Sequence, residues 1–130
     1  MIYLHKHKVG YAETDQMGFM HHSNYARIFE NARWELFRSL GLPYKQIENE
    51  GILMPVVDME LKFRKPAFYD DELTVNTTIK KRTGVKIFFE YTVTNSKQET
   101  INIGKTTLAF MDKHTRKPVR VPEIIAQIIN

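Results

Sequence analysis

The sequence predicts an α+β fold in which one long helix lies against a mainly antiparallel sheet of about five strands. Two patterns carry this prediction. Residues 24–40 place apolar side chains three and four positions apart, as on one face of a helix. Much of the remaining chain alternates apolar and polar residues, as strands with one buried face do. The connections are too short for helical crossovers, which favours antiparallel pairing and a twisted sheet that curls around the helix.

A first strand is expected at residues 5–11, followed by a loop at residues 12–22. The helix at residues 24–40 then starts at Ser23 or Asn24, whose side-chain oxygens can accept bonds from first-turn amides. Its apolar face comprises Tyr25, Ile28, Phe29, Ala32, Leu36 and Leu40, and it stops before Gly41 and Pro43.

A short helical or irregular piece follows at residues 44–50, and the chain then turns to period two. The clearest strand alternates Val57, Met59, Leu61 and Phe63 with charged residues, which predicts that these four side chains are buried. Three more strands are expected at residues 73–82, 85–93 and 100–111, and a short amphipathic helix after Pro122. A sheet of this kind has an exposed edge, which pairing across a two-fold axis removes, so we expect a homodimer or homotetramer.

The composition limits the possible chemistry. The chain has 130 residues, 42% of them hydrophobic, which suits one domain spanning residues 1–130. It has no cysteine, so disulfides, thiolate metal sites and a cysteine nucleophile are excluded. No signal peptide or apolar run long enough to span a bilayer is present, and we expect a cytoplasmic protein without a membrane span. The net charge of +4 favours anionic partners.

The loop before the long helix contains the residues best suited to catalysis. It places the carboxylate of Asp15 before the helix start, a glycine at Gly18 for a tight fold, and His22 and Ser23 beside the unpaired first-turn amides. Hydrolysis of a thioester needs a base or nucleophile near the carbonyl carbon and donors for the developing oxyanion. Asp15 can activate water or attack directly to give a mixed anhydride, and amides near His22 and Ser23 can be the donors.

Residues 11–25, with Asp15-Gln16-Met17-Gly18 and His22-Ser23-Asn24-Tyr25, resemble the active-site signature of the 4-hydroxybenzoyl-CoA thioesterase family of hot-dog-fold acyl-CoA thioesterases. The resemblance continues through residues 29–33 and 63–67 and covers nearly the whole chain. It implies the hot-dog fold, a catalytic role for Asp15 and a carbonyl-polarising amide near His22. In the bacterial acyl-CoA branch a tyrosine and a histidine assist, at the positions of Tyr11 and His22. The His21-His22 pair differs from the aryl-CoA branch, so a fatty or short-chain acyl group is expected.

The sequence offers two candidate clusters for the phosphates of coenzyme A, which is part of the substrate and not a cofactor. Lysine and arginine suit phosphoryl groups, and both clusters are basic. One lies around a predicted hairpin turn and contains Lys80, Lys81, Arg82 and Lys86; the other contains Lys62, Arg64 and Lys65. The sequence does not choose between them.

Other functions remain as alternatives. An acyl-acyl carrier protein thioesterase would use the same chemistry on an acidic protein partner, and a non-catalytic acyl-CoA-binding protein would not need Asp15. A hot-dog dehydratase would place its histidine in a different setting. No nucleic-acid-binding motif accompanies the basic charge. No metal is expected, because histidines at alternate strand positions, such as His5 and His7, are usually surface residues and the chain has no His-Glu-x-x-His pattern.

Overall fold

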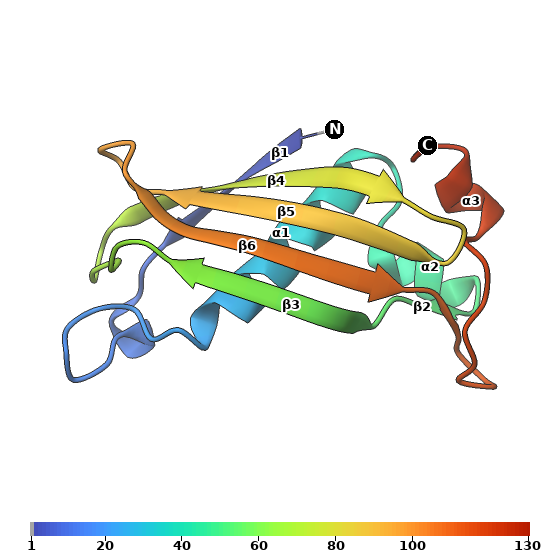
Figure 1. Cartoon of the computed structure of the whole chain (residues 1–130), viewed down its shortest axis with the longest axis horizontal. Coiled ribbons are helices and arrows are strands. Elements are labelled where there is room, and N and C mark those ends of the chain that lie inside the picture. The colour runs from blue at the N-terminus through green and yellow to red at the C-terminus, as the bar shows by residue number, and fades with distance from the viewer. Residues whose placement is uncertain (1) are drawn as a thin grey trace.

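The computed structural model describes residues 2–130, which form one five-stranded sheet with a long helix packed against one of its faces (Figure 1). The strands lie in the order β1-β4-β5-β6-β3, and every neighbouring pair is antiparallel. Their bounds are Ile2–Lys8 for β1, Val56–Phe63 for β3, Glu72–Arg82 for β4, Lys86–Thr94 for β5 and Thr100–Ala109 for β6. The predicted α+β class and the five antiparallel strands are therefore confirmed.

The helix α1 (Asn24–Ser39) runs behind the sheet in Figure 1 and is followed by the short helix α2 (Tyr44–Asn49). A separate two-stranded ribbon joins β2 (Ile52–Leu53) to β7 (Met111–Asp112), and α3 (Glu123–Ala126) follows near the C-terminus. Within residues 2–130, no helix combines the length and apolarity that crossing a bilayer requires.

The core lies between α1 and the sheet. The predicted apolar face of α1 is buried except at its end, where Leu40 is half-buried. Phe29 stacks on Tyr91 of β5, with ring centroids 4.1 Å apart and planes 8° apart. Its ring also lies against the backbone of Gly104 in β6, the neighbour of Tyr91 across the strands. This contact brings the middle of the helix close to the sheet.

The first strand differs from its predicted bounds of residues 5–11. β1 ends at Lys8, and the chain turns into the 3-10 helix η1 (Tyr11–Glu13). The carboxylate of Glu13 accepts the Gly10 amide (2.8 Å), which closes this turn. Tyr11 is therefore on a turn and not at the end of a strand.

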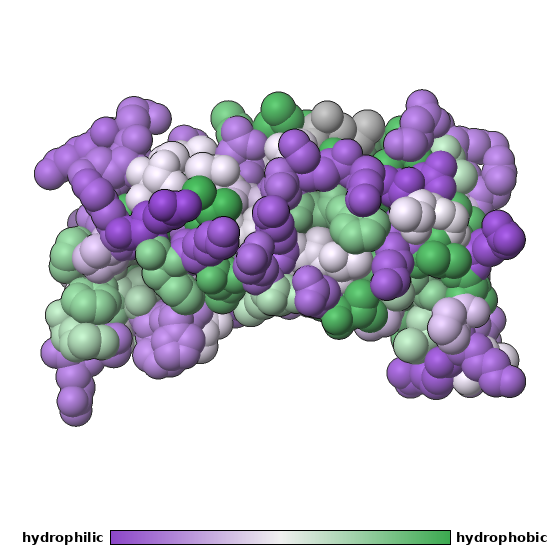
Figure 2. All heavy atoms as spheres, viewed as in Figure 1, coloured by the Kyte–Doolittle hydropathy of each residue, from purple (hydrophilic) through white to green (hydrophobic). Residues whose placement is uncertain are grey.

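The burial predicted for β3 was wrong for three of its four apolar residues. Val57, Met59 and Phe63 are 52%, 38% and 55% exposed, whereas Leu61 packs against the core. The alternation does place apolar and charged side chains on opposite faces, but β3 is an edge strand and α1 covers only part of it. The other face of the sheet shows hydrophilic side chains mixed with apolar ones (Figure 2).

Candidate active site

The loop between η1 and α1 is a tight hairpin that holds Asp15 near its tip. Thr14 and Met20 form an antiparallel bridge, and the Asp15 amide donates to the carbonyl of Phe19 (3.0 Å). Gly18 has a φ of +88°, a left-handed conformation that a side chain would strain, and its amide donates to the Asp15 carbonyl (3.0 Å). Oδ1 of Asp15 accepts the Met17 amide (2.9 Å). Within residues 2–130 this is the one hydrogen bond to the carboxylate, which leaves Oδ2 available.

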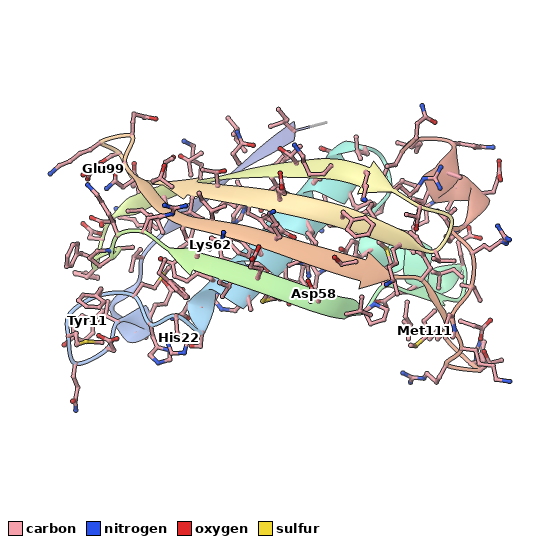
Figure 3. All side chains as sticks on the ribbon, in the orientation of Figure 1. Tyr11, His22, Asp58, Lys62, Glu99 and Met111 are labelled. Atoms are coloured by element: carbon pink, nitrogen blue, oxygen red, sulfur yellow. The ribbon has the colours of Figure 1, made fainter. Side chains whose placement is uncertain are left out.

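Asp15 and His22 line the same cavity, which has a volume of about 380 Å³. The two residues come from opposite ends of the loop, and Figure 3 shows His22 just before α1. Most of the other lining is apolar, and two of its residues are cations: Met17, Phe19, Met20, Tyr25, Phe63, Arg64, Lys65 and Pro66. The cavity thus brings together a carboxylate, a residue just before the helix start, apolar surface and positive charge.

Most of the backbone amides at the start of α1 already donate a hydrogen bond within the chain. His21 donates to the carbonyl of Glu13 (2.8 Å), and the Ser23 amide donates to Nδ1 of His21 (3.2 Å). Asn24 and Tyr25 donate to the carbonyls of His21 and His22. In the segment 21–25, the His22 amide is the one backbone donor with no acceptor among the described residues.

Ser23 occupies the N-cap position, but its side chain does not cap α1. Its hydroxyl bonds to Nδ1 of His21 (2.8 Å), and its backbone is already helical, with φ −62° and ψ −20°. The side chain of Asn24 also bonds elsewhere, donating to the carbonyls of Glu13 and His21 (3.0 Å each). The predicted side-chain cap was therefore wrong, because both side chains form hydrogen bonds to His21 or Glu13 instead.

Aromatic rings form one wall of the cavity. Phe63 meets Tyr25 edge-on, with centroids 5.7 Å apart, and His22 at 6.3 Å. Burial raises the pKa of Tyr25 to about 12, so its hydroxyl stays protonated and neutral near pH 7. The wall therefore offers apolar ring faces and one uncharged hydroxyl group.

Comparisons with known proteins identify the family of the chain. The family model described as the thioesterase-like superfamily matches residues 9–129. The chain belongs to this superfamily. YneP of Bacillus subtilis, named as a candidate acyl-CoA thioesterase, is 35% identical over 87% of this chain and 82% of its own. The acyl-CoA thioesterase YbgC of Haemophilus influenzae is 29% identical over 89% and 85% of the two chains.

The fold is shared with solved thioesterase structures. The DHNA-CoA thioesterase from Staphylococcus aureus superposes with a TM-score of 0.89 and 34% identity, over 92% of this chain and 80% of that one. This likeness confirms the hot-dog fold, and together with the named relatives it supports the assignment of the chain as a thioesterase enzyme.

Tyr11 lies outside the cavity lining. Its side chain is 77% exposed and meets the ring of Tyr69 edge-on, with centroids 5.6 Å apart. Tyr11 and His22 lie at the same end of the molecule (Figure 3), but Tyr11 does not line the cavity that Asp15 and His22 share.

Only one of the two predicted basic clusters reaches the cavity. Arg64 and Lys65 line it, whereas Lys80, Lys81, Arg82 and Lys86 lie around the β4–β5 turn. Across the sheet, Ile87 at this turn lies level with Leu108 and Val56, and Val93 lies level with Asn102 and Phe63. The two clusters are thus separated by about six residues along β5 and β6, or about 20 Å.

The side chains at the turn have local contacts. Lys80 pairs with Glu90 (3.4 Å), Lys81 lies over the Phe88 ring (4.7 Å), and Nε of Arg82 donates to the Ile129 carbonyl (2.6 Å). Within residues 2–130, no three His, Asp or Glu side chains gather as metal ligands.

Several lining residues were not identified from the sequence as site residues. Phe63 was assigned to the core, and Met17, Phe19 and Met20 had no assigned role. The alternation of residues 57–64 predicts opposite faces for Phe63 and Arg64, yet both residues line the cavity. Their shared position beside the loop depends on β3 lying at the sheet edge, which the alternation does not specify.

Proposed function

We propose that this thioesterase hydrolyses acyl-CoA thioesters to the free acid and coenzyme A, with Asp15 as general base or nucleophile and the His22 amide as an oxyanion donor. The observation that carries the proposal is that Asp15 and His22 line one cavity while the His22 amide has no acceptor within the described chain. Ser23 is the weaker candidate for an oxyanion donor, because its amide already donates to His21.

Two chemical routes fit these groups. In the first, Asp15 takes a proton from water as the oxygen attacks the carbonyl carbon; the tetrahedral oxyanion collapses, and the coenzyme A thiolate leaves and is protonated. In the second, the Asp15 carboxylate displaces the thiolate to form a mixed anhydride, which water then hydrolyses. In both routes an amide donor stabilises the same negative oxygen, and losing one such donor typically costs about 3 kcal/mol in the barrier.

The test is hydrolysis of a panel of aliphatic and aromatic acyl-CoAs, followed with a thiol-detecting reagent beside Asp15→Asn. Asn keeps the size of the side chain but cannot take a proton, so we expect kcat to fall by at least about a hundredfold. Turnover close to wild type in a folded Asp15→Asn protein would refute the role of Asp15. A single turnover in ¹⁸O-water tests the anhydride route, because an acid product without label requires that its new oxygen came from Asp15.

The acyl group is proposed to be aliphatic, fatty or short-chain. An aromatic acyl group is the second candidate, because Tyr25 and Phe63 give the cavity a ring-lined wall and the Staphylococcus aureus relative is named for DHNA-CoA. The acyl-CoA panel ranks the two classes by kcat/KM. The same acyl groups on acyl carrier protein test the alternative carrier.

We propose that Arg64 contacts the phosphates of coenzyme A. Its side chain is exposed at the cavity and has no ion pair within the described chain, whereas Lys65 is held by Oε2 of Glu99 (2.6 Å). Arg64→Ala should raise KM for an acyl-CoA several-fold but leave KM for the matching acyl-pantetheine, which lacks the nucleotide, unchanged. Lys81→Ala at the β4–β5 turn is the matched control, and a larger effect there would favour the rival cluster.

We also propose that a second copy of the chain covers β3, in a homodimer or in a tetramer built from it. This edge strand exposes Val57, Met59 and Phe63, and Phe63 also lines the cavity, so the interface would adjoin the site. Light scattering on wild type and Val57→Lys tests this, because a charge on an apolar interface should reduce the measured mass. A wild-type protein that is monomeric at micromolar concentration would refute it.

A further inference from the structure

We propose that Glu13 is a positioning residue for thioester hydrolysis, because one side chain and one carbonyl fix the loop that carries Asp15 against the helix start at His22. This inference rests on the function proposed above. It concerns a residue that lies outside the cavity lining.

The carboxylate of Glu13 joins three parts of the chain. It accepts hydrogen bonds from the Gly10 amide (2.8 Å), from Nε2 of His7 on β1 (2.9 Å), and from the guanidinium of Arg27 on α1. The side chain is 13% exposed. Burial alone would raise the pKa of Glu13, but the bonds from Gly10, His7 and Arg27 lower it overall, so the group is a carboxylate near pH 7.

The carbonyl of Glu13 joins the two ends of the loop. It accepts the His21 amide (2.8 Å) and Nδ2 of Asn24 (3.0 Å). Just inside this closure, Thr14 and Met20 form their bridge. Asp15 follows Glu13 by two residues, and His22 follows His21 by one. Both cavity residues therefore lie close in the chain to the hydrogen bond that joins Glu13 and His21.

This geometry matters because catalysis depends on small distances. A displacement of about 1 Å in a reacting group can cost about a hundredfold in rate. Without the carboxylate, the loop would lose its bonds to His7 on β1 and Arg27 on α1, and Asp15 could move relative to the His22 amide. The effect should appear in kcat more than in KM, because Arg64 and the apolar cavity wall contribute to binding and are not bonded to Glu13.

Glu35 on α1 provides a matched control. It also joins α1 to β1, accepting a hydrogen bond from the Tyr3 hydroxyl (2.9 Å) and lying 3.0 Å from Nδ1 of His5. It has no hydrogen bond to residues 10–22 and does not line the cavity. The Glu35→Ala variant therefore measures how much stability and kcat change when a bond between α1 and β1 is lost away from the loop.

The experiment compares Glu13→Ala and Glu35→Ala by steady-state hydrolysis, thermal melting and hydrogen–deuterium exchange of residues 14–21. We expect Glu13→Ala to lower kcat at least tenfold, to change KM less than threefold and to speed exchange in this loop. We expect Glu35→Ala to lower the melting temperature with kcat within twofold of wild type. The milder Glu13→Gln variant, which keeps one acceptor oxygen, should lie between wild type and Glu13→Ala, and it replaces the alanine variant if that protein does not fold.

The positioning role is refuted if Glu13→Ala keeps kcat within threefold of wild type, or if Glu35→Ala loses the same fraction of kcat. If wild type hydrolyses no thioester, the proposed function fails, and exchange then decides this inference by itself. Unchanged exchange of residues 14–21 in the Glu13 variants would overturn it, whereas faster exchange would support Glu13 as the residue that fixes the loop.

Discussion

Gly104 should be among the most sensitive positions in the protein. A Cβ built on this residue would lie 2.4 Å from Cε2 and 2.8 Å from Cζ of Phe29, where ordinary contacts begin near 3.4 Å. Phe29 is fully buried and stacks on Tyr91 beside the glycine. The ring cannot tilt freely, so Gly104→Ala must push α1 away from the sheet.

The magnitude follows from this geometry. Restoring a normal contact requires a displacement of about 1 Å, and overpacking a close-packed core typically costs about 1–3 kcal/mol. We expect a loss near 2 kcal/mol in the free energy of unfolding. For a chain of this size, each kcal/mol lowers the melting temperature by about 4 °C, which predicts a fall of about 8 °C.

The assay is thermal and urea unfolding of Gly104→Ala beside Gly84→Ala. The added Cβ at Gly84 would lie 3.7 Å from a side-chain atom of Arg120, an ordinary contact, so this control should change little. Phe29→Leu removes much of the ring, so Gly104→Ala should cost less in that background, and a double-mutant cycle measures the coupling. Equal losses at the two glycines, or zero coupling to Phe29, would refute the reasoning.

Three further outcomes are expected. Partial burial raises the pKa of Glu35, but the bonds from His5 and Tyr3 lower this pKa overall. Ionised Glu35 therefore stabilises the fold above the usual carboxyl pKa of 4.5, and this stability is lost as pH falls through the lowered value. The melting temperature of Glu35→Gln should thus fall less steeply than that of wild type below pH 4.5, and parallel curves would contradict this linkage. Ser23→Ala should cost less than the roughly 1 kcal/mol of a typical N-cap loss in urea unfolding, because the Ser23 hydroxyl makes no capping bond. Tyr11→Phe should lower kcat less than tenfold in the acyl-CoA assay, because Tyr11 lies outside the cavity lining, and a loss as large as that of Asp15→Asn would show that the tyrosine reaches the substrate.

The sequence predicts the elements of this fold well because their patterns are local. The face of α1 and the alternation of β4 and β5 both record which side chains meet the core, and the structure has these elements close to the expected residues. Arg33 shows the limit of the same reasoning. It is 4% exposed and donates to the hydroxyl of Tyr91 (3.1 Å), a partner 58 positions away that no helical periodicity identifies.

The site could be predicted only in part for the same reason. The loop motif predicts Asp15 and His22, seven residues apart, as site residues, and the local hairpin brings both to the lining of one cavity. The choice between the basic clusters depends on strand order, since β3 lies at the edge beside β6 and ends next to the loop. The residues of the two clusters carry no information about strand order.

Strand order also explains why the apolar face of β3 misled the burial prediction. The apolar face of an alternating strand can be buried by any apolar surface, whether that surface belongs to the same chain or to another. In β4 and β5 the cover is α1, but on β3 most of the alternating face meets solvent. Such an apolar face at an exposed edge, which Phe63 extends to the cavity, fits the proposal that a second copy of the chain covers β3.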